Sequence, residues 1–389
     1  MENEFIYPIF YIFTGAALLA TVALFTRQAL LIAYILLGVL LGPSGLKWVG
    51  DPDVLRQFSD FGIIFLLFLL GLNLPLQNLF RMLRETTLVT LVSSALFGLA
   101  AYFVTKLTGF SYIESLVVGV SMMFSSTIIG LKLLPTTILH HQRTGEIVIS
   151  VLLMQDIIAI FSMLFINAAG TGGGVSLEEA GWILVSLPAC VLAAFAVERT
   201  ILSKAMRRFN RIHEYLFLSA IGWCLACAVV TDMMGLSLEV GAFIGGITLA
   251  TSPIARFIAE NLKPLRDFFL ILFFFSLGAS IDLHLLQQVL WPALFLAVAM
   301  LILKPLILCV LLGRVGDGKQ RAMEVGMRLG QASEFSLLVS YMALSTELIT
   351  ESAAYLIQGA TVITFIVSSY IIVLRYPTPI AVSDELRRD

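Results

Sequence analysis

The chain has 389 residues, of which 59% are hydrophobic and only 13% are charged, and its formal net charge is −2. Apolar runs without charges recur from one end of the sequence to the other, which excludes a soluble domain and predicts a polytopic, all-α membrane protein. The nearly neutral charge gives no indication of a nucleic-acid partner, so membrane lipid is the surrounding that we expect.

Thirteen apolar segments are predicted to cross the membrane as helices. They are 6–25, 28–42, 57–72, 86–107, 112–134, 146–168, 181–200, 212–233, 236–250, 263–280, 287–312, 321–346 and 352–374. Several are shorter than the roughly 20 residues that a spanning helix needs, notably 28–42, 57–72 and 236–250. We therefore expect a transmembrane domain over 1–376 and a cytoplasmic tail or linker over 377–389.

The basic residues predict the orientation of the chain. An odd number of spans places the termini on opposite faces of the membrane. The loops on the face of the C-terminus hold twenty of the 24 basic residues, Arg328 among them, whereas the other face holds three and Lys304 lies within a span. Because Lys and Arg accumulate in cytoplasmic loops, we expect a cytoplasmic C-terminus and a periplasmic or extracellular N-terminus in a cell (inner) membrane.

A weak internal repeat runs through the sequence. Gly71 and Gly278, near the ends of the third and tenth segments, are 207 residues apart. The same shift relates Gly119 to Gly326 and Ser126 to Ser333. Such patterns indicate two inverted six-helix repeats, here about 6–168 and 212–374 with a linker helix at about 181–200, as in secondary transporters. Chance matches among small residues are the alternative.

Asp156 is the only acidic residue in the apolar run that follows Glu146, and Gln155 precedes it. Ten residues of helix correspond to about 15 Å, which is half of the roughly 30 Å hydrocarbon thickness. A carboxylate at that depth costs at least about 2.5 kcal/mol and by default marks an ion or proton pathway. The alternative is a protonated aspartic acid that is hydrogen-bonded to a neighbouring helix.

Two of the predicted helices are expected to be broken near mid-membrane, because hydroxyl residues and glycines cluster there. Segment 112–134 carries Ser125, Ser126 and Thr127, and segment 321–346 carries Ser333 and Glu334. Broken helices offer free carbonyls and helix ends that can replace the water around an ion. Hydroxyls alone would also serve helix packing, but the added Glu334 favours a binding site.

Lys304 is the remaining charge at depth, about 12 Å from the cytoplasmic end of its helix and thus level with Asp156. The following Pro305 should open the helix locally. We expect the lysine to pair either with Asp156 or with a freed backbone carbonyl, as a structural counter-charge. The matching position of the first repeat is Phe97, so the predicted site is asymmetric.

Several motifs together carry a resemblance to a known family. They occupy residues 38–46, 68–72, 125–127, 153–156, 241–243, 280–283 and 330–335. With them the chain resembles, over roughly 6–376, the membrane part of the monovalent cation:proton antiporter-2 family, close to its Kef-type potassium/proton antiporters. The resemblance implies a dimerisation bundle, hence a homodimer, and a mobile core bundle in which broken helices cross near the buried aspartate.

The resemblance also implies roles for individual residues. Asp156 would bind a cation and a proton alternately, and Gln155 would mark the Kef-like branch, where relatives with electrogenic exchange carry a second aspartate. Kef-type chains usually continue into a cytoplasmic nucleotide-binding regulatory domain. Two departures concern regulation: Asn73 replaces a glutamate, and residues 259–263 replace the acidic loop of glutathione-gated members, which removes the basis for expecting glutathione gating.

The expected function is therefore secondary antiport of K⁺, or Na⁺, against H⁺ by alternating access. The expected cation and proton site is K⁺ or Na⁺ at Asp156 with Gln155, Ser125, Ser126 and Thr127, supported by Lys304, Glu334 and Ser333. No cofactor beyond the transported ions is expected, and no enzyme, because no catalytic or metal-binding set appears at depth. The alternatives are a Na⁺/H⁺ antiporter, a sodium-coupled solute symporter and an ion-conducting subunit.

Overall fold

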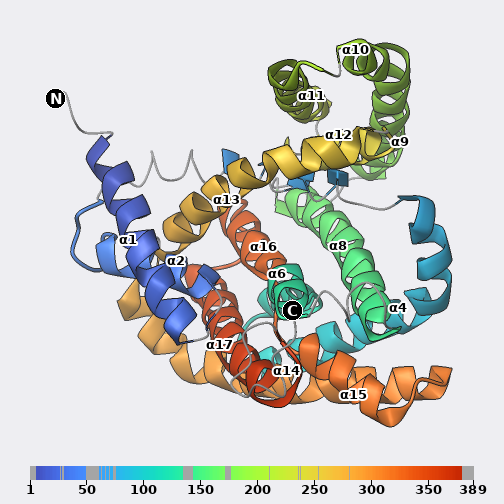
Figure 1. Ribbon diagram of the computed structural model, residues 1–389. Helices are drawn as coiled ribbons and strands as arrows, with labels where there is room; N and C mark the ends of the chain where they lie inside the picture. The colour runs from blue at the N-terminus through green and yellow to red at the C-terminus, as the bar shows by residue number, and fades with distance from the viewer. Residues whose placement is uncertain are drawn as a thin grey trace. The chain divides into compact units, whose positions relative to one another are not determined.

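The computed structural model describes residues 6–26, 28, 30–49, 61–62, 64–65, 67–69, 71–72, 76–134, 143–170, 177–209, 211–234, 236, 238–252, 254–279 and 281–378. They are almost entirely helical (Figure 1) and form two compact units. Unit 1 comprises Met1–Leu18, Tyr34–Leu79 and Gly173–Ser280, and unit 2 comprises Leu19–Ala33, Phe80–Gly172 and Ile281–Asp389. The all-helical fold expected from the sequence is confirmed for the described residues.

Unit 1 contains parts of the first two helices and all of the described helices between residues 177 and 279. These are α1 (Ile6–Phe25), α2 (Leu30–Leu41), α9 (Leu177–Val197), the π-helix η1 (Glu198–Leu202), α10 (Ser203–Arg208), α11 (His213–Met233), α12 (Leu238–Ala250) and α13 (Ala255–Ala279). Unit 2 contains most of α4 (Leu76–Leu107), α5 (Tyr112–Met122), α6 (Thr127–Lys132), α8 (Arg143–Gly170), α14 (Leu283–Val315), α15 (Lys319–Arg328), α16 (Glu334–Ser345) and α17 (Glu351–Arg375).

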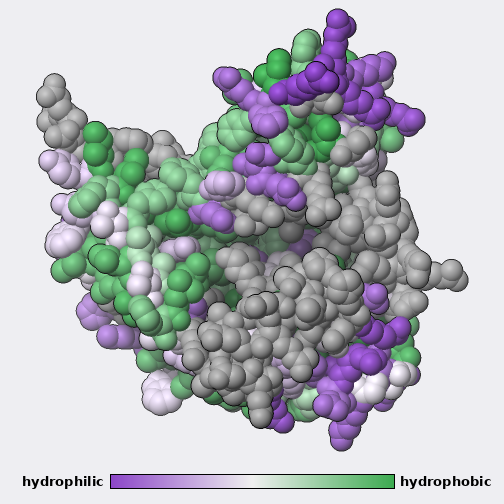
Figure 2. Space-filling view, in the orientation of Figure 1, coloured by the Kyte–Doolittle hydropathy of each residue, from purple (hydrophilic) through white to green (hydrophobic). Residues whose placement is uncertain are grey.

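Six of the described helices are long and apolar enough to cross a membrane. They are α1, the segments Thr86–Leu107, Arg143–Met163 and His284–Val315, and the helices α11 and α17. Their exposed residues are largely hydrophobic, as lipid contact requires. Figure 2 shows hydrophobic residues over α1, whereas hydrophilic residues gather over α10 and the first turns of α15.

The helices largely follow the predicted segments, but α4 begins at Leu76 rather than at 86, and three further differences bear on the predictions above. The third segment, 57–72, lies partly outside the described residues. Residues 259–263, expected in a loop, are instead helical, because α13 begins at Ala255 and continues through Pro264. Arg328, assigned above to a cytoplasmic loop, is fully buried at the end of α15. The expected breaks are confirmed, since segments 112–134 and 321–346 each form two short helices.

Glycines in unit 1 allow two helix pairs to touch backbone to backbone. A Cβ atom at Gly38 of α2 would collide with Phe275 O of α13. A Cβ atom at Gly246 of α12 would likewise collide with Phe68 O. The two acceptors, Phe68 and Phe275, are 207 residues apart, which is the shift found in the sequence.

The same shift relates two helix contacts in unit 2. A Cβ atom at Gly119 of α5 would lie 2.8 Å from Gly98 O of α4, and one at Gly326 of α15 would lie 2.7 Å from Pro305 O of α14. Gly119 and Gly326 are 207 residues apart, and so are Gly98 and Pro305. The predicted repeat thus recurs in equivalent contacts, while its outer boundaries stay a prediction.

Candidate ion site at two broken helices

The two helix breaks lie against each other within unit 2. The first separates α5 from α6 between Met122 and Thr127, and the second separates α15 from α16. Ser125 Oγ, in the first break, donates to Leu329 O in the second at 2.8 Å. Ser336 Oγ, in the first turn of α16, donates to Ser121 O of α5 at 2.6 Å. Hydroxyl groups therefore join one break to the other.

Each break ends where a serine starts a new helix. Ser126 Oγ accepts a hydrogen bond from Ile129 N at 3.1 Å, which satisfies one of the free N–H groups of α6. Ser333 Oγ accepts from Phe335 N at 3.1 Å, and Ser333 N donates to Ser336 Oγ, which forms a capping box. Ser126 and Ser333, two of the three serines predicted as site residues, thus act here as N-caps.

Thr127 and Glu334, the first residues of α6 and α16, contact each other. Thr127 Oγ1 donates to Glu334 Oε1 at 3.1 Å, and the two residues are 207 positions apart. The carboxylate of Glu334 is buried and lies at the start of a helix, where the positive end of the helix dipole stabilises negative charge. The carboxylate of Glu334 at the second break therefore accepts a hydrogen bond from Thr127 at the first.

Lys304 binds one backbone carbonyl in each of the same two breaks. Its Nζ donates to Phe124 O at 2.6 Å and to Gln331 O at 2.8 Å, and these two acceptors are again 207 residues apart. The side chain is fully buried, and its Nζ lies 5.1 Å from the centre of the Phe97 ring, the matching position of the first repeat.

Of the two pairings expected for Lys304, the structure shows the bond to freed carbonyls. No ion pair between Lys304 and Asp156 is present among the described residues, so the first alternative, a direct pair between these two residues, is wrong. The physical reason is that each break directs one unwound backbone carbonyl, that of Phe124 or of Gln331, at the same point, and an ammonium group has enough donors for both.

Asp156 lies at the fourteenth of the 28 residues of α8, and only 2% of its surface is exposed. Its Oδ2 has no hydrogen-bond partner in the described part of the chain. A buried carboxylate oxygen without a donor is unfavourable unless a proton or a cation can bind there.

Gln155 has both ends of its amide engaged by the first break. Its Oε1 accepts from Ser125 N at 3.0 Å, and its Nε2 donates to Met123 O at 3.2 Å. It therefore holds the unwound backbone beside Asp156. At the second break Thr364 of α17 takes the corresponding place, because its Oγ1 accepts from Ala332 N at 3.0 Å.

Three residues that our sequence reasoning missed, Thr364, Ser368 and Arg328, contact the breaks or border them. Gln331 accepts through Oε1 from Ser368 Oγ at 2.9 Å, which ties the second break to α17. Thr364 and Ser368 lie four residues apart on one buried face of α17, a polar stripe that could have been detected in the sequence. The third, Arg328, gave no signal, because an arginine at a predicted helix end resembles a loop residue.

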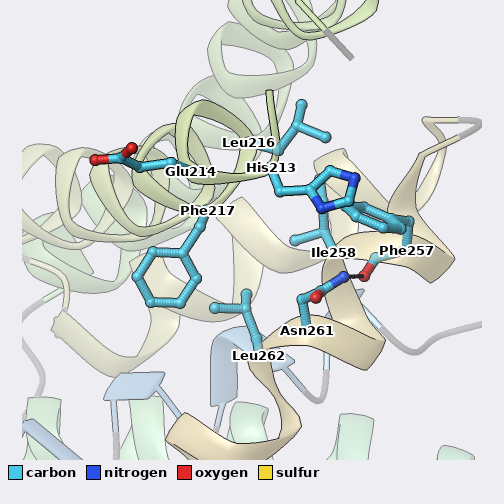
Figure 3. Close-up of a pocket in the computed structure, with 8 residues that line it drawn as sticks. All are labelled: His213, Glu214, Leu216, Phe217, Phe257, Ile258, Asn261 and Leu262. Atoms are coloured by element: carbon cyan, nitrogen blue, oxygen red, sulfur yellow. Dashed lines mark hydrogen bonds between the residues drawn. The ribbon is translucent and has the colours of Figure 1, made fainter. Parts of the chain in front are cut away.

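A separate cavity of about 250 Å³ lies in unit 1, between the starts of α11 and α13 (Figure 3). His213 packs beside the ring of Phe257, with the ring centres 4.9 Å apart. Asn261 Nδ2 donates to the Phe257 carbonyl at 2.8 Å. None of the predicted site residues lines this cavity, so it does not belong to the ion site of unit 2.

Comparison with known proteins agrees with this arrangement. Residues 4–374 match the family described as sodium/hydrogen exchanger, transmembrane. K(+) efflux antiporter 4 of Arabidopsis thaliana is 28% identical over 349 residues, which cover 87% of this chain and 58% of that protein. The iron transporter MagA of Paramagnetospirillum magneticum is 25% identical, over 88% of this chain and 79% of that protein.

The fold is similar to that of a solved antiporter. The sodium proton antiporter MjNhaP1 from Methanocaldococcus jannaschii superposes with a TM-score of 0.74 at 16% identity, over 94% of this chain and 96% of that one. The chain spans 58% to 61% of the length of the Arabidopsis relatives that it matches. The match over nearly the whole chain shows that this multi-pass membrane protein belongs to the sodium/hydrogen exchanger family, a family of transporters rather than enzymes.

Proposed function

We propose that this domain is a secondary antiporter that exchanges a monovalent cation for H⁺ at Asp156. The observation that carries the proposal is the buried Asp156 carboxylate, whose Oδ2 has no donor among the described residues. It lies in the same unit as two broken helices whose ends are held together.

Exchange follows from competition for one group. A carboxylate that carries a proton has lost most of its affinity for a metal ion, and a bound cation repels the proton. Loading one therefore expels the other, whichever side of the membrane the site faces. Glu334 and Thr127 form the second part of the proposed site, and Lys304 is proposed to replace a cation at the carbonyl ends of the breaks, which keeps both breaks assembled when the site is empty.

K⁺ is the cation that we favour, because the Arabidopsis relatives are named K(+) efflux antiporters. Na⁺ is the second candidate, supported by the description of the matching family and by the name of the similar solved structure. We further propose a homodimer in a cell (inner) membrane with a cytoplasmic C-terminus, and a cytoplasmic nucleotide-binding regulatory domain or subunit as a partner. The proposed membrane and orientation extend the argument from the basic residues. The proposed dimer and regulatory partner extend the family resemblance.

Proton movement in everted membrane vesicles tests the proposal. Adding K⁺ or Na⁺ to acidified vesicles should release protons, and the apparent cation affinity should fall as the pH is lowered, because protons compete for Asp156. Asp156→Asn should abolish the release while the protein is still inserted at wild-type level. Fe²⁺ and a large impermeant cation are added to the vesicles in separate runs of the same assay, for comparison with K⁺ and Na⁺.

Three results would contradict the proposal. Cation-dependent proton release that persists in Asp156→Asn would show that Asp156 is not the shared site. Cation flux whose rate and apparent affinity do not change with pH would indicate an ion-conducting subunit instead, and proton or sodium flux that requires an organic solute would indicate a symporter.

A further inference from the structure

Arg328 is a fully buried arginine that the proposed ion exchange does not use. It is the last residue of α15, one residue before Leu329, whose carbonyl accepts the bond from Ser125. A guanidinium group carries five N–H donors and keeps its charge, so burying it requires several acceptors. The identity of those acceptors shows which segments the arginine joins.

The guanidinium binds three segments at once. Its Nε and Nη2 donate to Glu324 Oε1, one turn earlier on α15, at 3.0 and 2.9 Å. Its Nη1 donates to Leu133 O, directly after α6, at 3.0 Å. Its Nη2 also donates to Pro377 O, two residues beyond α17, at 2.9 Å. We call this set of bonds the Arg328 clamp.

The segment that leaves α17 is further held by its neighbours. The Tyr376 ring lies 5.6 Å from Arg328 Cζ, within the range of a cation–π contact. Thr378 is fully buried. This segment, Tyr376–Thr378, is thus attached to the half-helices α6 and α15, and each of these has one of the two breaks at one end, α6 at its start and α15 at its end. All of these residues belong to unit 2.

We propose that the Arg328 clamp couples the position of the Tyr376–Thr378 segment to the geometry of both breaks, so that displacing this segment changes ion exchange. Moving Pro377 away would leave a buried, charged donor without its acceptor, which is unfavourable. The half-helices and the segment should therefore move together. This inference rests on the proposed function, because exchange at Asp156 is the activity that the clamp would regulate.

Two kinds of variant test the clamp from its opposite ends. Arg328→Lys keeps the charge but cannot reach Glu324, Leu133 O and Pro377 O together, because an ammonium group is a single point of charge. Its matched control is Arg321→Lys on the same helix, where the side chain is 44% exposed and makes one 3.4 Å bond to Asp317. Inserting Gly-Gly between Arg375 and Tyr376 displaces the segment with Arg328 intact, and the same insertion after Ser383 is its control.

Two measurements on the full chain in membranes separate the clamp from the transport activity. Hydrogen–deuterium exchange reports whether the amides of Tyr376 and Thr378, which flank Pro377, and those at the end of α6 become less protected. Cation-induced proton release in vesicles, followed against pH and cation concentration, reports exchange. We expect Arg328→Lys and the insertion before Tyr376 to increase deuterium uptake at both places and to change the apparent cation affinity or maximal rate by about fivefold or more, the lower end of typical coupling between sites.

The two controls should change neither measurement. Unchanged deuterium uptake in Arg328→Lys would show that the clamp does not hold the segment, and increased uptake with wild-type exchange would show that the segment is not coupled to the site. Either result overturns the inference while leaving the proposed function in place. A wild-type protein without cation-dependent proton release would instead refute the proposed function, whatever the deuterium uptake shows. If Arg328→Lys fails to insert, the insertion variant decides the question.

Discussion

Lys304→Met is the substitution that most directly tests how the two breaks are held together. Methionine has nearly the length and shape of the lysine side chain, but it has no donor. The change would leave Phe124 O and Gln331 O without the bonds that they now accept at 2.6 and 2.8 Å. Each buried acceptor that loses its partner costs about 1–3 kcal/mol, so the two together should lower the free energy of unfolding by about 2–6 kcal/mol.

The lower half of this range is the more realistic expectation for Lys304→Met. Removing the ammonium group also removes the unfavourable desolvation of a fully buried charge, which offsets part of the loss. Lys304→Arg keeps the charge and should retain more stability than Lys304→Met. Lys106→Met is the matched control, because Lys106 Nζ donates to one carbonyl only, Phe110 O at 3.1 Å, at the partly exposed end of α4.

Thermal unfolding in detergent, followed by tryptophan fluorescence, measures these differences, and proton release in vesicles measures their effect on exchange. We expect the melting temperature to fall clearly further in Lys304→Met than in Lys106→Met, together with a loss of exchange. A Lys304→Met protein that melts with the wild type would refute the reasoning. It would mean that the two carbonyls find other donors, and that the lysine does not assemble the breaks.

Two further predictions concern packing and stoichiometry. Gly278→Ala should destabilise the protein by about 1–3 kcal/mol, because its Cβ would collide with Ile35 O. Gly222→Ala, which meets no neighbour, should be neutral or slightly stabilising in thermal unfolding. Equal melting temperatures of the two variants would contradict the close approach of α2 and α13. Exchange should be electroneutral, since the Gln155 amide does not titrate. Gln155→Asp should make the exchange depend on membrane potential. A wild-type exchange equilibrium that shifts with an imposed potential would contradict this stoichiometry.

Much of the fold was predictable because the membrane restricts the choices. Every backbone polar group in hydrocarbon needs a partner within its own segment, so long apolar runs become helices. The breaks were predictable for a related reason: Ser126 and Ser333 are favourable N-caps, and clustered hydroxyls can bond to a backbone that leaves the helix. The depth of Asp156 followed from the helical rise alone.

The shift of 207 residues was visible in the sequence as weak matches between glycines and serines. The structure shows that the shift relates residues that act together at the breaks: Thr127 bonds directly to Glu334, and the carbonyls of Phe124 and Gln331 both accept from Lys304 Nζ. A linear pattern of small residues predicts that two segments are alike. It does not predict that equivalent positions will contact each other.

The amino-acid sequence by itself determined the class of protein, the helices, their breaks and the buried carboxylate, since all of these depend on composition and local spacing. Only the tertiary structure decided which partners the polar groups have. Lys304 binds two carbonyls rather than Asp156, and Arg328 binds three segments rather than lying in a loop. The reason is that a long basic side chain can reach many acceptors, and the one it binds depends on how residues up to 200 positions apart are packed around it.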